Sequence, residues 1–329
     1  GVPQNLFYPG ADQSVVEEQI LKGSCPFLYA WNGERFEFVT DLMWKSALGM
    51  PMGLMAQGDA EYAPPAPSQE YLRIPGDALQ LRDGRYEIRV TGELWEVFFI
   101  DEVDLLMIDH PDSIDVFVDE RFVFAEPDAP LRLHQLSARR RPLSAVDHRG
   151  RDVLPALSAS DDVYVSDFEP GRYQGVSEVH DLILDLGDFG ANEAVQLYLR
   201  GWIFPTDASI NVALSQSDAL GTIMPYLEAI NAAGQWETVV PMLSFPSGKN
   251  KTVIQDLTGL FATADHRVRL RTNMNIYWDE AFLSVGSTDA PVMVTRLEPE
   301  TADFRYRGFS RQYRKGGRFG PHWFDYQTV

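Results

Sequence analysis

Three methionines stand close together in the pattern M-x-M-x-x-M, at Met50, Met52 and Met55. Thioether sulfur is a soft ligand, so a loop that gathers these side chains could bind Cu(I), or ligate a haem through one of them. The stretch contains no histidine, and unbranched methionine also fills irregular apolar gaps well. We therefore favour packing, with an apolar contact surface and a soft-metal site as alternatives.

Carboxylates gather in short runs, the first of them at Asp109, Asp112 and Asp115. Loop carboxylates of this kind can supply part of the roughly six to eight oxygens that Ca²⁺ takes. None of the runs follows the EF-hand pattern, and 48 acidic residues make such clusters common by composition alone. A solvated acidic face is the default interpretation, and a structural Ca²⁺ site is the alternative.

Aromatic side chains could serve as platforms for sugar rings. The candidates are Trp44, Trp202, Trp278 and Trp323. Trp202 and Trp278 lie in strand-like runs, so packing in a core is the favoured interpretation for these two.

The C-terminal region is basic, although the whole chain has a formal net charge of −20. Between residues 304 and 319 the basic side chains are Arg305, Arg307, Arg311, Arg314, Lys315 and Arg318, and no acidic residue accompanies them. The acidity of the remaining chain disfavours nucleic acid as a partner. We expect this segment to contact an acidic protein surface, because guanidinium groups pair well with carboxylates.

Sequence motifs for catalysis are lacking. The chain has no G-x-S-x-G, H-E-x-x-H, P-loop or G-x-G-x-x-G pattern, and its six histidines are scattered. A carboxylate pair for glycoside hydrolysis is defined in space, so the sequence leaves a carbohydrate-active unit open. We expect no catalytic residues and no cofactor. No run reaches the roughly 18 apolar residues of a transmembrane helix, so we expect no transmembrane segment.

The periodicity is that of β-strands separated by turns. The runs 26–31 and 35–42 flank Asn32-Gly33, which predicts a hairpin with a type I′ turn, and Asp83-Gly84 predicts another. A short helix is expected near 153–160. A second series of strand-like runs covers 179–188, 194–204, 209–216, 235–243, 251–257 and 266–285, and within this series a helical turn is expected only in 217–234.

These patterns predict a mainly β chain with two antiparallel β-sandwich domains, jelly-roll or galactose-binding-like, and a basic aromatic C-terminal tail. The predicted divisions are an N-terminal extension (1–19), a first β domain (20–130), a linker or crossover (131–175), a second β-sandwich (176–290) and an extended basic tail (291–329).

Several long phrases of the chain resemble one group of proteins. The phrases are SCPFLYAWNGERFEFVTDL (24–42), DHPDSIDVFVDERF (109–122), KTVIQDLTGLF (251–261), RVRLRTNMNIYWDEAF (267–282) and YRGFSRQYRKGGRFGPHWFDY (306–326). The group is the C-terminal region of exported bacterial proteins with FG-GAP repeats and ASPIC/UnbV segments, related to cartilage acidic protein and sometimes containing tetratricopeptide repeats. The resemblance implies an exported, non-catalytic and β-rich module of a larger polypeptide, and it implies no established activity. From the sequence as a whole we favour a binding or structural module, periplasmic or extracellular in a processed chain, that engages a protein partner or a glycan within a larger assembly.

Overall fold

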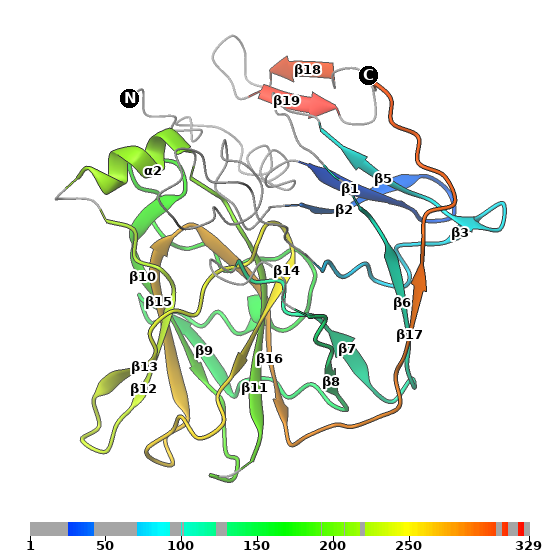
Figure 1. Cartoon of the computed structure of the whole chain (residues 1–329). Coiled ribbons are helices and arrows are strands. Elements are labelled where there is room, and N and C mark those ends of the chain that lie inside the picture. The colour runs from blue at the N-terminus through cyan, green and yellow to red at the C-terminus, as the bar shows by residue number, and fades with distance from the viewer. Residues whose placement is uncertain are drawn as a thin grey trace, which may run out of the picture. The chain divides into compact units, whose positions relative to one another are not determined.

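The computed structural model describes residues 26–42, 71–92, 100, 102–122, 130–191, 193–206, 208–217, 221–306, 311–314 and 322–325 (Figure 1). This part of the chain is mainly β, with antiparallel sheets, one α-helix (α2, Ala208–Ser215) and one 3-10 turn (η1, Pro155–Leu157). No helix within these ranges is long and apolar enough to cross a membrane. The chain divides into two compact units, which we describe separately.

The first unit contains Asp115–Thr288 and residues 71–73. One of its sheets has the strand order β13-β12-β15-β10-β9. These strands are β9 (Ser144–Asp147), β10 (Val176–Asp185), β12 (Tyr226–Ile230), β13 (Trp236–Val240) and β15 (Arg267–Met274). A second sheet has the order β14-β11-β16, and its strands are β11 (Val195–Ile203), β14 (Lys251–Asp256) and β16 (Ile276–Val285).

The β14-β11-β16 sheet is buried on both faces. On one face, Tyr198, Ile254 and Phe282 pack against two residues from the pair β7 (Asp115–Phe117) and β8 (His134–Leu136). The rings of Tyr198 and Phe282 are stacked with centroids 4.8 Å apart. Successive strand residues point to opposite faces, so Leu197 and Leu199, both fully buried, lie on the other side. Continuously apolar runs of this kind are typical of strands covered on both faces.

Helix α2 corrects the prediction of a strand over 209–216. Ile210 and Leu214 are both buried and pack with Val176 and Tyr173, whereas Val212 is exposed. Residues four apart share one face of a helix, while alternate residues share one face of a strand. The alternating pattern of the sequence therefore did not decide the structure here. A helical turn is expected within 217–234, but in the described residues 221–234 of this segment the structure has strand β12 and no helix.

The second unit contains residues 26–42, 74–114 and the described residues from 289 onwards. Its three-stranded sheet has the order β2-β1-β5, made of β1 (Phe27–Trp31), β2 (Phe36–Asp41) and β5 (Ile88–Thr91). Two-stranded pairs join β3 (Leu81–Arg82) to β4 (Arg85–Tyr86), β6 (Leu105–Asp109) to β17 (Met293–Leu297), and β18 (Arg311–Arg314) to β19 (His322–Asp325).

Both predicted hairpins form, but one of the two turns differs from the expectation. At β3–β4, Asp83 and Gly84 have φ of 51° and 80°, as a type I′ turn requires. At β1–β2 the connection is longer, and of its residues only Gly33 has positive φ. The Oδ1 atom of Asn32 accepts hydrogen bonds from the backbone N–H groups of Glu34 and Arg35, which stabilises the longer turn.

Two segments contain strands that their predicted roles do not include. The 131–175 segment, predicted as a linker or crossover, contributes β8, η1 and β9, and β9 pairs with β10 as the edge of the five-stranded sheet. The 291–329 segment, predicted as an extended tail, contributes β17, β18 and β19. The predicted N-terminal extension, 1–19, lies outside the described residues.

Candidate binding surface on strands β6 and β17

Strands β6 and β17 form an antiparallel pair in which Asp109 lies opposite Met293 and Leu105 lies opposite Leu297. No residue of either strand is fully buried. Met293 and Val294 are 61% and 45% exposed. This pair therefore presents apolar side chains to solvent, which buried strands such as β11 do not.

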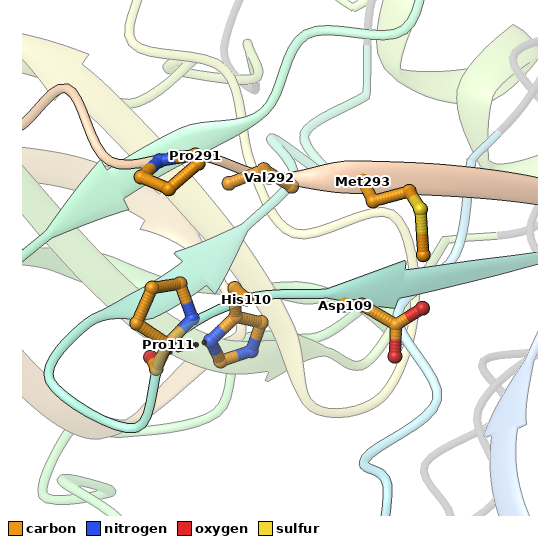
Figure 2. Close-up of a pocket in the computed structure, with 6 residues that line it drawn as sticks. All are labelled: Asp109, His110, Pro111, Pro291, Val292 and Met293. Carbon is orange, nitrogen blue, oxygen red and sulfur yellow. Dashed lines mark hydrogen bonds between the residues drawn. The ribbon is translucent and has the colours of Figure 1, made fainter.

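A shallow depression lies at the end of this pair, with a volume of about 360 Å³ (Figure 2). Its lining residues are Asp109, His110, Pro111, Pro291, Val292 and Met293. In Figure 2 the Met293 side chain extends from β17 toward the strand that carries Asp109. The Nδ1 atom of His110 lies 3.1 Å from the carbonyl oxygen of Pro111.

The chemistry of the depression suits binding of a small apolar group beside a polar one. Two prolines fix the local backbone, and with Val292 and Met293 they supply apolar contact area. The Asp109 carboxylate can accept hydrogen bonds from a cationic or amide group at the rim. The site is open and shallow, so it matches part of a partner surface better than an enclosed ligand.

Charged side chains near β17 are largely paired within the second unit. Arg296 binds both Glu102 and Asp104. Glu300, which follows β17 in the chain, is bound by Arg85, whose Nε atom lies 3.1 Å from Oε2 of Glu300. These exposed pairs add little stability, but they match both arginines with carboxylates of the same unit. Apolar side chains are therefore the main feature that this surface offers to a partner.

Aromatic side chains follow β17 in a segment without strand pairing, residues 301–306. Phe304 is 99% exposed and Tyr306 is 79% exposed. Arg305, between them, binds Asp303 with a 3.4 Å contact. We use the name β17 surface for three sets of residues taken together: the six residues that line the depression, the exposed Val294 within β17, and Phe304 and Tyr306 in the segment that follows the strand.

The basic residues predicted to contact a partner are only partly described. Arg305 lies beside Asp303, as stated above, and Arg311 and Arg314 are the terminal residues of β18, opposite Asp325 and His322 of β19. Three others lie outside the described residues, namely Arg307, Lys315 and Arg318.

The predicted Ca²⁺ ligands Asp109, Asp112 and Asp115 stay a prediction. Among the described residues, no group of three His, Cys, Asp or Glu side chains is arranged to hold a metal ion. Asp109 lines the depression, and Asp115 binds Arg139 at 2.8 Å. The methionines of the proposed copper site, Met50, Met52 and Met55, lie outside the described residues.

Two of the four candidate tryptophans are core residues. Trp202 is 3% exposed and stacks on Tyr277 with ring centroids 4.3 Å apart, and Trp278 is 2% exposed. Burial of these two side chains agrees with packing in a core, the favoured interpretation of the sequence. Trp323 lies in β19 opposite Tyr313, and Trp44 is outside the described residues.

The first unit contains buried charges that the sequence analysis did not single out. Asp279, in β16, and Lys251, in β14, are both 0% exposed, and Glu120 is 5% exposed. A signal was present, because charged residues inside the apolar runs YWDEAF and KTVIQDL need partners if the strands are buried. Pairing partners remote in sequence could not be read from those runs.

The pKa of Asp279 is raised to about 6, mainly by burial and also by the nearby Asp162 carboxylate, although hydrogen bonds from Ser160 and from the Asp161 backbone act to lower it. Burial also tends to raise the pKa of Asp162, but its partners, Tyr164 first among them, hold that pKa below the usual value. Two carboxyl groups with pKa values moved apart can act as acid and base. Asp279 is however fully buried, so we interpret this pair of carboxyl groups as a structural feature of the first unit.

A comparison of the chain with protein-family models, curated proteins and solved structures finds no match.

Proposed function

We propose that the chain is a non-catalytic, exported module that binds a protein partner through the β17 surface. The observation that carries this proposal is the exposure of Phe304, a residue 99% exposed in the segment 301–306, where no strand is assigned. Large aromatic side chains are enriched at the centres of protein interfaces, because burying them there releases much apolar surface from water.

The paired charges on and near β17 support a protein partner. The charges on Arg85, Arg296 and Arg305 are each matched by a carboxylate of the same unit, so complementarity rests on the apolar side chains. The depression beside Met293 could receive one apolar side chain of the partner, with Asp109 facing a polar or basic neighbour. A chain with a net charge of −20 also favours a basic partner.

The fold and the location of the protein belong to the same proposal. Burial of β11 and β16 on both faces supports a β-sandwich in the first unit. The resemblance to C-terminal regions of exported FG-GAP and ASPIC/UnbV proteins supports a periplasmic or extracellular module within a larger assembly.

Affinity capture followed by direct titration tests the function. The chain is immobilised to capture exported proteins of the producing cells, and each captured protein is then purified and titrated against the chain in solution. We expect the double variant Phe304→Ser, Tyr306→Ser to bind the partner at least about tenfold more weakly, as loss of aromatic interface anchors does.

A matched control comes from an apolar side chain of similar exposure elsewhere. Leu143 is 65% exposed in the first unit, and Leu143→Ser should leave the affinity unchanged. Equal affinity of the wild-type chain and the double variant for every captured protein would contradict the proposal.

A further inference from the structure

The buried pair Lys251 and Glu120 has an unusual geometry. The Lys251 side chain is 0% exposed and that of Glu120 is 4% exposed, and Nζ lies 4.0 Å from Oε1. In the described part of the chain, Nζ makes no hydrogen bond. An ammonium group held this way has lost its water without gaining a hydrogen-bond acceptor, which is costly.

The carboxyl group of Glu120 is held in place by backbone groups on both of its oxygens. Oε1 accepts a hydrogen bond from the Arg73 backbone N–H, and Oε2 accepts one from the Thr252 backbone N–H, each at 3.0 Å. The backbone N–H of Glu120 also donates a hydrogen bond to the carbonyl of Thr252 in β14, at 2.8 Å. The carboxyl group is therefore held in one orientation, with Oε1 at 4.0 Å from Nζ of Lys251.

This arrangement suits attack of the amine on the carboxyl group. Attack requires the amine of Lys251 without its extra proton, and the Glu120 carboxylate, 4.0 Å away, is an acceptor for that proton. The neutral amine is a nucleophile. Each carboxyl oxygen accepts one backbone N–H, so the oxygen that stays in the product has a donor that can stabilise its negative charge in a tetrahedral intermediate.

We propose that Lys251 and Glu120 form an intramolecular isopeptide bond. Nζ of Lys251 attacks Cδ of Glu120, so that an N–C bond forms and one C–O bond breaks. The departing oxygen leaves as water, with its own proton and one proton from the amine. The step needs no oxidant, reductant or cofactor, and it removes two buried charges. The product ties the Glu120 segment covalently to the start of β14.

A mass measurement on the denatured wild-type chain tests this bond directly. We expect the intact chain to be lighter than its sequence mass by one water molecule. Proteolysis should give a branched peptide that joins the segment around Glu120 to the segment around Lys251, identified by fragmentation. A chain with the full sequence mass would overturn the proposal.

Localisation of the loss is essential, because a succinimide at Asp83-Gly84 would have the same mass. A water loss found in a linear peptide, with no branched peptide, also overturns the proposal. Lys251→Arg should abolish the loss, whereas Lys249→Arg, at another buried lysine two residues away, should retain it. The wild-type measurement decides the question even if Lys251→Arg does not fold.

Discussion

Ser160 donates a hydrogen bond from Oγ to Oδ2 of Asp279 at 3.1 Å, and so ties the segment after η1 to the interior of β16. The Asp161 backbone N–H donates to Oδ1 of the same carboxyl group at 3.2 Å. Burial nevertheless raises the pKa of Asp279 from 3.8 to about 6. The folded protein therefore holds this proton more tightly than the unfolded chain does.

This raised pKa predicts how stability changes with pH. The contribution of the Asp279 proton is fully present below pH 3.8, decreases between pH 3.8 and about 6, and is lost above that range. For Asp279→Asn, the unfolding free energy relative to wild type should increase by about 2–3 kcal/mol from acidic to neutral pH. Urea unfolding of both proteins across this range measures the difference, and a pH-independent difference would contradict the assignment.

Using the difference between the two proteins matters because His180 titrates in the opposite sense. Burial lowers the pKa of His180, so its contribution is present above pH 6.5 and is lost as the pH falls below that value. The effect of His180 is common to wild type and Asp279→Asn, and it cancels in the difference.

Arg139 connects two carboxylates across an aromatic surface. Its guanidinium contacts Asp115 at 2.8 Å and Glu280 at 3.0 Å, and lies 4.9 Å from the ring centroid of Phe282. Arg139→Met keeps apolar contact with the ring but leaves Glu280, 10% exposed, without its cation. We expect a loss of about 2–3 kcal/mol in the free energy of unfolding, measured by urea denaturation.

The control for Arg139 is an exposed ion pair of the same unit. The side chains of Arg267 and Asp265 are 49% and 31% exposed, so Arg267→Met should cost less than about 1 kcal/mol. Equal losses in the two variants would show that burial of Glu280 is not what makes Arg139 important.

Gly201 lies where the register of β11 and β16 shifts by one residue. An added Cβ would meet the Tyr277 carbonyl oxygen and would come within 3.0 Å of the Trp278 ring. Because backbone and a packed indole cannot move aside easily, Gly201→Ala should destabilise the first unit by about 1–3 kcal/mol. Gly221→Ala is the control, since nothing lies within 4 Å of its added Cβ. Thermal unfolding of both variants should separate them clearly, and equal melting temperatures would contradict the close contact.

The sequence predicts local structure well where neighbours along the chain decide it. Asp83-Gly84 is such a case, because positive φ at both residues depends on their own conformational freedom. The β1–β2 turn was less predictable, since the Asn32 side chain stabilises a longer connection. The contact between Glu120 and Lys251 depends on how two segments remote in sequence pair. Neither local sequence predicts that pairing.

The candidate surface also depends on contacts between segments that are remote in sequence, so the sequence predicts it poorly. Asp109 was singled out as an oxygen ligand for Ca²⁺, but the structure places it beside Met293 in an open depression. That neighbour is set by the pairing of β6 with β17, two strands far apart in the chain. The exposure of Phe304 was likewise not predictable, because an aromatic residue next to arginines is compatible with a core, a docked arm or a free segment.

Helix α2 provides a test that separates the structure from the sequence-based prediction. Ile210 and Leu214 are 7% and 6% exposed, and Val212 between them is 55% exposed. Leu214→Ala should therefore cost about 2–4 kcal/mol, the usual loss for truncating a buried leucine. Val212→Ala should change the free energy of unfolding by less than about 0.5 kcal/mol, as at other exposed positions. In a strand, residues 210, 212 and 214 would share one face, and truncation at 212 would then be as costly as at 214. Urea denaturation of the two variants thus distinguishes a helix from the predicted strand without further structure determination.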